Sequence, residues 1–287
     1  MKGLSLLLTL SLLLTGCGGQ AGSRQETIPA DSGIVQESQI GQENSSAPAQ
    51  TGLIAEQVLD GADGEIHYSY YLPDSYDSSK EYPMMVVMPG YDMMWFGEDS
   101  SGSNLDWKGF RVWTELEEEM IVVSAQLTDW GEKSARQAVE LTEYFLENFS
   151  VDESRVYAAG YSAGGETMSQ AVSMRPDLYA AYLHGASQWD GEFAPVAENQ
   201  VAVYIFMAEN DEYYGSQKAR DAYDGLYAAY EEAGLSESEI EKLLQLEIPE
   251  DAYFNRLGIY DNYHGGGNVL FDDPDILNWI VQHRKNP

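Results

Sequence analysis

The sequence predicts a single α/β domain whose mostly parallel sheet is covered by helices on both faces. Short apolar runs of strand length alternate with longer stretches whose apolar residues recur at helical spacing. Strands that alternate with helices pair in parallel, because each helix carries the chain back across one face of the sheet. An alternating aromatic segment near the start adds an antiparallel hairpin. The length, 287 residues, is roughly that of one large domain.

The predicted strands are segments in which apolar residues either alternate or run continuously. Glu65–Leu72 alternates, is rich in aromatic residues and follows the turn-like Asp60–Gly64, so it predicts one arm of the early hairpin. Met84–Met88 is continuously apolar and ends at Pro89-Gly90, which is typical of a strand buried on both faces. The other predicted strands are Ile121–Ala125, Arg155–Ala159, Tyr179–Leu183 and Val201–Met207.

The predicted helices lie between these strands. Ala138, Leu141, Phe145 and Phe149 recur at helical spacing, so residues 134–149 are expected to form an amphipathic helix. A second helix is expected to begin beside Ser162. The remaining predicted helices are Ser216–Ala233, a weaker stretch around Ser238–Leu246, and a closing helix that begins with Ile276–Val281.

Composition and charge exclude several classes of protein. Lys and Arg number 15 against 48 Asp and Glu, and the formal net charge is −33. Such a surface repels phosphate backbones, so a nucleic-acid partner is excluded. The hydrophobic fraction of 44% is too high for a wholly disordered chain. One cysteine allows neither a disulfide framework nor a multi-cysteine zinc site, and no metal-ligand spacing, phosphate loop or nucleotide motif is present, so no cofactor is expected.

The amino-terminal segment has the pattern of an export signal. Lys2 precedes the apolar run Leu4–Leu14, which is too short for a good membrane span. The run ends in Leu14-Thr15-Gly16-Cys17, which resembles the bacterial lipobox, where the signal is cut before a cysteine that then receives a lipid. An ordinary signal peptide with an incidental cysteine is the alternative. We therefore expect a signal peptide over 1–16, the lipidated Cys17 and a disordered tether over 17–50, and the folded domain over 51–287.

One short motif indicates nucleophilic chemistry. Gly160–Gly164 fits the pattern G-x-S-x-G, with a predicted strand entering it and a predicted helix leaving it. That context predicts a sharp strand-to-helix turn that exposes the hydroxyl of Ser162, with glycines permitting close approach of the helix to neighbouring strands. A glycine–serine turn without chemistry is the alternative.

A serine hydroxyl needs a base to accept its proton, and the chain has only four histidines. His67 lies on the early hairpin and His283 on the closing helix, so both are predicted to be surface residues. His184 ends a predicted strand and could face the cleft. His264 occupies a loop just before the closing helix, from which an imidazole can reach over the carboxyl edge of the sheet. His264 is therefore the preferred base and His184 the alternative.

A carboxylate that orients the base should lie between the nucleophile and the histidine in the chain. The predicted strand Val201–Met207 is followed by an acidic turn, and a carboxylate just beyond a strand end suits this geometry. Asp211 is the preferred candidate, with Glu209 and Glu212 as alternatives. An acidic loop without chemistry is the other interpretation.

Together these residues resemble the α/β-hydrolase superfamily, and more narrowly its secreted branch of feruloyl esterases and polyhydroxybutyrate-depolymerase-like esterases. Val151–Gly165 is similar to that branch's D-x-x-R-V-Y-x-x-G-x-S-x-G-G stretch, and a looser similarity extends from Glu65 to His283. The resemblance implies that Ser162 is the nucleophile, Asp211 the acid and His264 the base.

The resemblance also implies an oxyanion hole formed by the backbone N–H groups of Tyr91 and Ala163. Two positions depart from the family pattern: Pro89-Gly90 stands where relatives usually carry His-Gly, and Gln137-Ala138-Val139 stands where they often carry Asp-Asp-Val.

Aromatic residues in loops after strands are candidates for binding substrate, since flat aromatic faces suit sugar rings or aromatic acyl groups. Core or surface packing is the alternative for each of them. The segments Gly102–Trp107 and Asp211–Tyr214 are expected to shape the pocket. The candidate substrate-binding residues are Trp95, Trp130, Trp189 and Tyr213.

The esterase resemblance implies a serine esterase that cleaves a soluble or polysaccharide-linked ester. The lipobox-like segment adds that the protein is expected to lie outside the cytoplasm, held at the membrane only through its lipid. Two alternatives remain open. A prolyl-oligopeptidase-like peptidase would use the same catalytic residues, although the β-propeller usual in such peptidases is absent from these 287 residues. A catalytically inactive hydrolase fold would serve as a surface binding protein.

Overall fold

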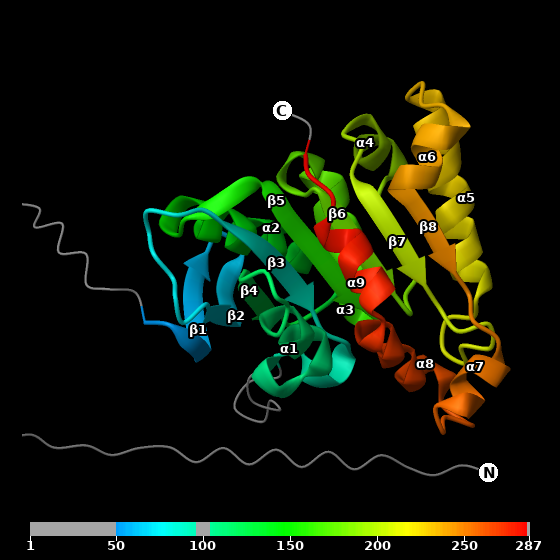
Figure 1. Ribbon diagram of the computed structural model, residues 1–287, viewed down its shortest axis with the longest axis horizontal. Helices are drawn as coiled ribbons and strands as arrows, with labels where there is room; N and C mark the ends of the chain where they lie inside the picture. Colours follow the sequence, from blue (N-terminus) through cyan, green and yellow to red (C-terminus); the bar gives the residue numbers. More distant parts are fainter. Residues whose placement is uncertain (1–49, 96–103, 286–287) are drawn as a thin grey trace, which may run out of the picture. The chain divides into compact units, whose positions relative to one another are not determined.

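An eight-stranded sheet organises the part of the chain that the computed structural model describes, residues 50–95 and 104–285 (Figure 1). The strand order is β1-β2-β4-β3-β5-β6-β7-β8. β2 pairs antiparallel with β1 and with β4, and every other pair is parallel. This arrangement confirms the predicted α/β fold class and its early hairpin. The strands are β1 (Gly52–Gly61), β2 (Gly64–Leu72), β3 (Tyr82–Met88), β4 (Ile121–Gln126), β5 (Val151–Tyr161), β6 (Ala181–Gly185), β7 (Ala202–Phe206) and β8 (Leu244–Glu247).

Each helix predicted from the sequence has a counterpart in the structure, and the structure contains further, shorter helices that were not predicted. The shorter helices α1, α4, α7 and α8 have too few turns to give a periodic apolar signal. The helices are α1 (Lys108–Thr114), α2 (Glu132–Asn148), α3 (Ala163–Met174), α4 (Phe193–Glu198), α5 (Gln217–Glu232), α6 (Glu237–Leu243), α7 (Asp251–Arg256), α8 (Tyr263–Gly266) and α9 (Pro274–Val281), with the 3₁₀ segment η5 (Gly267–Asp272) between α8 and α9.

The stretch predicted as a weak helix around Ser238–Leu246 is only partly helical, so that prediction was wrong at its end. α6 starts from a capping box in which Ser236 and Glu239 bond reciprocally, and it stops at Leu243. The chain then extends as β8, which pairs with β7, and Leu244 is buried against the core. Pairing with the sheet edge overrides the local helical preference here.

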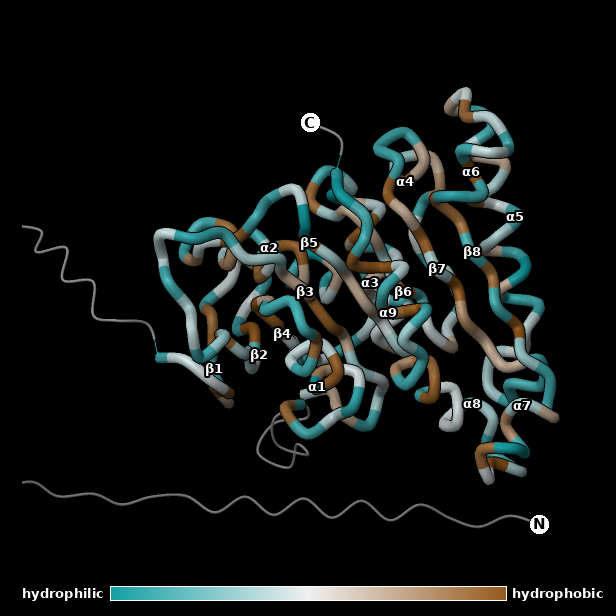
Figure 2. The backbone as a smooth tube through the Cα atoms, in the orientation of Figure 1, coloured by the Kyte–Doolittle hydropathy of each residue, from teal (hydrophilic) through white to brown (hydrophobic). Residues whose placement is uncertain are grey.

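The core divides between the two faces of the sheet, because alternate residues of a buried strand point in opposite directions. On β3, Met84, Val86 and Met88 belong to the same buried cluster as residues of α2, α3, α4 and α5, whereas Met85 and Val87 belong to the cluster that includes residues of α1, η5 and α9. In Figure 2 the strands carry much of the hydrophobic colour, and α5 is largely hydrophilic. Both faces are covered, as a mostly parallel sheet requires.

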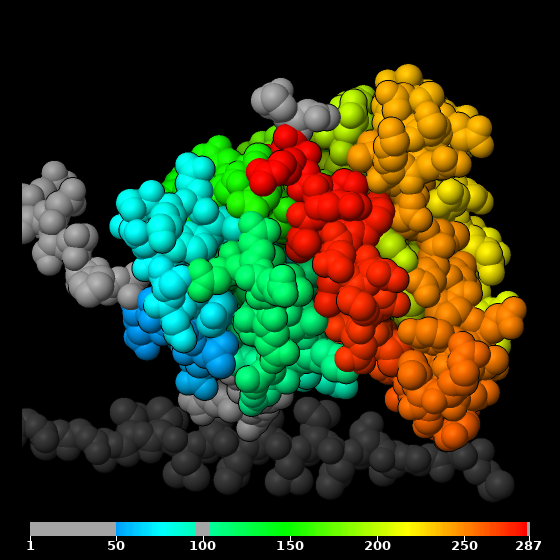
Figure 3. Space-filling view, viewed as in Figure 1, coloured from blue at the N-terminus to red at the C-terminus, as the bar shows by residue number. Residues whose placement is uncertain are grey.

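The last described helix closes one face of the sheet. α9 contacts β5, β6 and β7, and its residues Ile276, Leu277 and Ile280 are buried. In Figure 3 this red segment lies between green-cyan and orange regions, so it covers the middle of that face. The Tyr157 hydroxyl of β5 donates to the carbonyls of Val281 and His283, which ties the end of α9 to the strand that leads into Ser162.

Several sequence predictions fall outside the described residues. The predicted signal peptide, Cys17 and all of the predicted tether before residue 50 precede them, and of the predicted pocket loop Gly102–Trp107 only the part from Asn104 onward is described. Within the described part of the chain, no helix combines the length and apolarity needed to cross a membrane.

Candidate active site

Ser162 sits in a turn whose backbone is set by close packing. The residue lies between β5 and α3 with φ 54° and ψ −126°, a conformation that is costly for a residue with a Cβ. A Cβ on Gly164 would lie 2.2 Å from the Met88 carbonyl oxygen, and one on Gly160 would lie 2.5 Å from that of Gly164. The motif glycines therefore allow α3 to start directly against β3 and β5.

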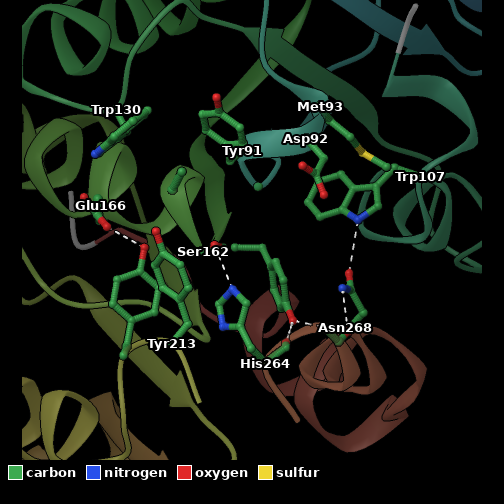
Figure 4. Close-up of a pocket in the computed structure, with 15 residues that line it drawn as sticks. Tyr91, Asp92, Met93, Trp107, Trp130, Ser162, Glu166, Tyr213, His264 and Asn268 are labelled. Carbon is green, nitrogen blue, oxygen red and sulfur yellow. Dashed lines mark hydrogen bonds between the residues drawn. The ribbon is translucent and has the colours of Figure 1, made fainter. Parts of the chain in front are cut away.

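Ser162 is one member of a hydrogen-bonded triad of side chains. Its Oγ lies 3.0 Å from Nε2 of His264 (Figure 4). Nδ1 of His264 lies 2.8 Å from Oδ2 of Asp211. Because a carboxylate only accepts, Nδ1 carries the proton and donates a hydrogen bond to Asp211. Nε2 is then the acceptor of the Ser162 hydroxyl, which is the tautomer that can remove a proton from the serine.

Asp211 is held as a buried carboxylate. Its side chain is fully buried, and its Oδ1 accepts hydrogen bonds from the backbone N–H groups of Tyr213 (3.0 Å) and Tyr214 (2.8 Å). Burial acts to raise the pKa of Asp211, but the hydrogen bonds from His264 and from these backbone groups outweigh it, so the pKa lies below its usual value. The alternative acid Glu212 instead accepts from the backbone N–H of His264 at 3.0 Å.

The loop that carries His264 is fixed by hydrogen bonds rather than by burial. The Tyr161 hydroxyl donates to the His264 carbonyl, and the Asn262 side chain accepts from the Gly265 N–H at 2.9 Å. Asn262 itself has a φ of 125°. These contacts orient α8 so that the imidazole faces Ser162, while 19% of the side chain remains exposed.

The alternative base, His184, lies away from the cavity. It is completely buried on β6, where Nε2 donates to the Ser187 carbonyl and Nδ1 accepts from the Tyr182 hydroxyl at 2.7 Å. Burial lowers its pKa to about 4, so it is neutral at pH 7.

The other two histidines, predicted to be surface residues, are both half-buried, so that prediction was wrong. His67 stacks on Trp95, and His283 packs on Trp279. The stacking of His67 on Trp95 joins residues on separate segments, which the local sequence does not indicate. His283 meets the edge of Trp279, four residues before it in the chain.

The residues predicted to supply an oxyanion hole both line the same cavity as Ser162 and His264. Ala163 is the first residue of α3, and the first N–H groups of a helix have no partner within the helix. Tyr91 begins the short 3₁₀ turn after β3, beside Gly90, where a Cβ would lie only 3.4 Å from the Ser162 Cβ. Pro89-Gly90 therefore brings the chain that leads into Tyr91 close to Ser162.

The cavity has a volume of about 430 Å³ and two sides of different character. On one side of Ser162 lie Trp107 and Met93, with the Trp107 Nε1 donating to Asn268 Oδ1 at 3.1 Å. The other side is formed by aromatic residues and one carboxylate, of which Figure 4 labels Tyr91, Trp130, Tyr213 and Glu166. Tyr214, whose hydroxyl bonds to Glu166, also lines the cavity. The two segments expected to shape the pocket therefore both reach it, one through Trp107 and the other through Tyr213 and Tyr214.

Two of the four predicted substrate-binding aromatics line this cavity, namely Trp130 and Tyr213. The other two lie elsewhere. Trp95 stacks on His67, with ring centroids 3.6 Å apart. Trp189 packs against Tyr182, His184 and Phe193, and its Nε1 donates to the Gly191 carbonyl at 2.9 Å. Position after a strand end does not distinguish these two roles, because it does not specify which way the side chain points.

Glu166 was not anticipated from the sequence, and neither was its contact with Tyr214, which was expected only as part of the pocket segment Asp211–Tyr214. The Tyr214 hydroxyl donates to Glu166 Oε1, and this bond joins the loop that holds Asp211 to the helix that begins just after Ser162. Burial raises the pKa of Glu166, with the bond from Tyr214 opposing and nearby Asp190 adding to the rise. Burial and the contact with Glu166 also raise the pKa of Tyr214. The available signal was their spacing: Glu166 is one helical turn beyond Ser162, and Tyr214 is three residues beyond Asp211.

No group of His, Cys, Asp and Glu side chains among residues 50–95 and 104–285 is arranged to hold a metal ion. The site as described offers a hydroxyl, an imidazole, a carboxylate and backbone donors as its reactive groups. This set matches the requirements of nucleophilic acyl transfer.

Known proteins share parts of this sequence. The family model described as "Prolyl oligopeptidase family" matches residues 124–235, which include Ser162 and Asp211. Feruloyl esterase B of Thermothelomyces thermophilus is 27% identical over 169 residues, which cover 54% of this chain and 57% of that esterase. The match therefore spans little more than half of either protein.

Solved structures share the fold at low sequence identity. A thermostable esterase aligns with a TM-score of 0.67 and 18% identity, covering 81% of this chain and 63% of that one. The feruloyl esterase module of Clostridium thermocellum, complexed with sinapinate, aligns with a TM-score of 0.54 and 15% identity, covering 84% and 92%. The chain thus has the α/β-hydrolase fold.

Proposed function

We propose that this chain is a serine hydrolase that cleaves carboxylic esters through an acyl-enzyme. The observation that carries the proposal is the continuous pair of hydrogen bonds from Ser162 through His264 to Asp211, 3.0 Å and 2.8 Å long, at the carboxyl edge of the sheet. The esterases among the relatives and structural neighbours support the same assignment.

In the proposed reaction, Ser162 Oγ attacks the ester carbonyl while His264 Nε2 accepts the hydroxyl proton. The backbone N–H groups of Ala163 and Tyr91 stabilise the oxyanion, a contribution of about 10²–10³ in turnover for one donor. The carbon–oxygen bond to the alcohol then breaks, and His264 returns the proton to the departing oxygen. Water repeats the sequence on the acyl-enzyme and releases the carboxylic acid. Asp211 keeps the imidazole in the required tautomer and stabilises its charged form.

The first test is labelling of residues 50–287 with a fluorophosphonate, with the adduct located by mass spectrometry. We expect labelling at Ser162 that disappears in Ser162→Ala and falls sharply in His264→Ala. A well-folded protein that is not labelled would contradict the proposal and favour the inactive binding protein instead.

A second candidate is peptidase activity, which the match of residues 124–235 to the prolyl oligopeptidase family favours. Ester and amide cleavage use the same catalytic groups. Comparison of kcat/KM for a p-nitrophenyl acyl ester and for peptide p-nitroanilides separates the two: the ester should be the better substrate by several orders of magnitude, and efficient anilide cleavage would favour the peptidase.

We also propose that the protein acts outside the cytoplasm, anchored by a lipid on Cys17, because the segment up to Gly16 has the pattern of a lipoprotein signal. Metabolic labelling of the full chain in a bacterial host with a radioactive fatty acid tests this. Label in the membrane fraction should be lost in Cys17→Ser, and a Cys17→Ser protein that still carries label would contradict the proposal.

A further inference from the structure

We propose that the Tyr214 hydroxyl, held by Glu166, positions the water that hydrolyses the acyl-enzyme and has little part in forming that acyl-enzyme. This inference rests on the proposed ester hydrolysis. It concerns the second half of the reaction, in which water replaces Ser162 as the group that gives a proton to His264. Tyr214 and Glu166 both line the cavity that holds these reacting groups.

The single proton of the Tyr214 hydroxyl is donated to Glu166. The hydroxyl bonds to Glu166 Oε1, and a phenol has no second hydrogen to donate. Glu166 is only 7% exposed, so few water molecules compete with Tyr214 for this acceptor. A carboxyl oxygen accepts in either protonation state, so the raised pKa of Glu166 does not remove the bond. The Tyr214 oxygen is therefore left to act as a hydrogen-bond acceptor toward the cavity.

The Tyr214 hydroxyl lies beside the reacting groups. Burial and the contact with Glu166 raise the pKa of Tyr214, and the nearby Ser162 hydroxyl opposes that rise. The centroid of the Tyr214 ring lies 5.6 Å from that of the His264 imidazole. The Tyr214 backbone N–H donates to Asp211 Oδ1 at 2.8 Å. The tyrosine is thus held at its backbone and at its hydroxyl, and a water that approaches the imidazole beside the serine meets its oxygen.

The two nucleophiles of the reaction differ in the number of hydrogens that they carry. The Ser162 hydroxyl has one, which it donates to His264 Nε2 at 3.0 Å. Water has two, so that one goes to Nε2 and the other needs an acceptor of its own. A polar hydrogen without a partner costs free energy in an enclosed site. Deacylation therefore requires the Tyr214 oxygen, whereas acylation does not.

In the proposed step, the water oxygen bonds to the acyl carbon while one of its protons passes to His264 Nε2. Its second hydrogen stays on that oxygen and is donated to Tyr214. When the tetrahedral intermediate collapses, the bond between the acyl carbon and Ser162 Oγ breaks, and His264 returns the proton to Oγ. Tyr214 contacts the reacting water but neither gains nor loses a proton. Glu166 is a positioning residue, because it acts through Tyr214.

An alcohol distinguishes this role from a purely structural one. Methanol attacks the acyl-enzyme as water does, but its one hydroxyl hydrogen passes to His264. Its methyl group takes the place of the second hydrogen of water and needs no acceptor. Loss of the Tyr214 oxygen should therefore slow hydrolysis of the acyl-enzyme and spare methanolysis, whereas general damage to the triad would slow both equally.

The test measures how one acyl-enzyme divides between water and methanol. The purified protein is given p-nitrophenyl acetate with added methanol, and the methyl acetate and acetate formed are quantified. In Tyr214→Phe we expect the ratio of methyl acetate to acetate to rise about tenfold, as expected for loss of one hydrogen bond to the water. The rate constant of acylation, measured from the first turnover of p-nitrophenol release, should stay close to that of the wild type.

Two variants of Glu166 separate its hydrogen bond from its charge. Glu166→Met removes the acceptor and frees the Tyr214 proton to turn toward the cavity, so the ratio should rise as in Tyr214→Phe. Glu166→Gln keeps an acceptor oxygen and should hold the ratio near the wild-type value. If Tyr214→Phe does not fold, the comparison of these two variants decides.

The matched control is Tyr204→Phe. It also removes a tyrosine hydroxyl that donates to a glutamate, Glu247 at 2.8 Å, but this pair lies on β7 and β8 and does not line the cavity. The ratio of methyl acetate to acetate in this variant should equal that of the wild type.

Three results would overturn the inference. One is an unchanged ratio in Tyr214→Phe, whether or not the overall rate falls. Another is a ratio that rises as much in Tyr204→Phe. The third is a Glu166→Gln protein whose ratio rises as far as that of Glu166→Met. A wild-type protein that releases no p-nitrophenol and whose Ser162 is not labelled by fluorophosphonate would instead contradict the proposed function itself.

Discussion

The turn at Ser162 and the loop at His264 meet at one cavity but are held by different forces. Around Ser162 the backbone atoms of β3, β5 and α3 approach so closely that Gly160 and Gly164 leave no space for a Cβ. Around His264 the contacts are hydrogen bonds made by Tyr161, Glu212 and Asp211. Excluded volume fixes the position of Ser162, and a set of separate hydrogen bonds orients the His264 imidazole.

This difference indicates which part of the site tolerates small changes in geometry. Overlap between closely packed backbone atoms cannot be relieved by a small adjustment, so a substitution that creates such an overlap disrupts the packing of the whole turn. A group of hydrogen bonds can be weakened one at a time, each worth about 1 kcal/mol net. We therefore expect changes at the turn to act mainly on folding and changes at the loop to act mainly on turnover, in graded steps.

The largest effect is expected from Asp211→Asn, which tests the loop at its most important bond. An amide NH₂ facing Nδ1 favours the tautomer whose Nε2 carries the proton, so the serine loses its base. We expect kcat for ester hydrolysis to fall by about 10⁴-fold. Thermal unfolding should show that the variant is folded, and a loss of less than tenfold would mean that Asp211 does not set the tautomer.

The turn is tested by Gly164→Ala, whose Cβ would lie 2.2 Å from the Met88 carbonyl oxygen. We expect the free energy of unfolding, measured in urea, to fall by about 3 kcal/mol. Gly131→Ala is the matched control, since its Cβ would meet nothing closer than Asp129 Oδ1 at 3.8 Å. A Gly164→Ala protein as stable as this control would show that the turn is not sterically fixed.

His184, beneath the turn, makes the free energy of unfolding depend on pH. Its Nε2 bonds to Ser187, whose hydroxyl donates to the Ser162 carbonyl at 2.7 Å. Because burial lowers the pKa of His184 from 6.5 to about 4, unfolding takes up a proton between these two pH values. The stabilisation is complete above pH 6.5 and is lost as the pH falls toward 4.

We therefore expect the free energy of unfolding of the wild type to decrease from pH 7 to about pH 4.5, with up to about 3 kcal/mol arising from His184. A second contributor in the same range is His283, whose pKa burial also lowers to about 4. Urea unfolding at both pH values should show a smaller decrease in His184→Gln. An unchanged decrease would mean that His184 is not the titrating group.

The smallest effect is expected from Tyr161→Phe, which removes one bond from the His264 loop. The free energy of unfolding should fall by about 1 kcal/mol, and kcat should fall severalfold because the imidazole is less well oriented. Tyr157→Phe is the control on the same strand: its hydroxyl also donates to backbone carbonyls, but away from the cavity. Equal kcat values for the two variants would contradict graded control by the loop.

The contrast between the Ser162 turn and the His264 loop also explains which features could be predicted from the sequence. The turn at Ser162 is encoded locally, in five consecutive residues between a strand and a helix, so its position was predictable. His264 was chosen by elimination among four histidines, and it lies within hydrogen-bonding distance of Ser162, 102 positions away in the chain. The alternating strands and helices of the fold were predictable for a similar reason, since apolar periodicity is a local property.

Contacts between distant segments were not predictable. Nothing in the pattern around Tyr161 indicates that its hydroxyl bonds to the His264 carbonyl, or that Tyr214 bonds to Glu166. Trp95 and Trp130 both follow strands, yet only Trp130 lines the cavity. The direction of a side chain in a loop depends on neighbours that a single sequence does not identify, and the same holds for β8, which is a strand because β7 is beside it.

The hydrogen bonds between β5 and the segment from the end of α9 onward have a consequence for how the site is completed during synthesis of the chain. Ribosomes add residues from the amino end, so Ser162 is synthesised 102 residues before His264. The Lys285 N–H donates to the Ser154 carbonyl at 2.9 Å, and the Tyr157 hydroxyl bonds to Val281 and His283. A nascent chain that ends before residue 263 contains Ser162 but lacks His264. In the proposed mechanism, synthesis of the last segment and its docking on β5 therefore complete the site, and ester hydrolysis is expected only after that.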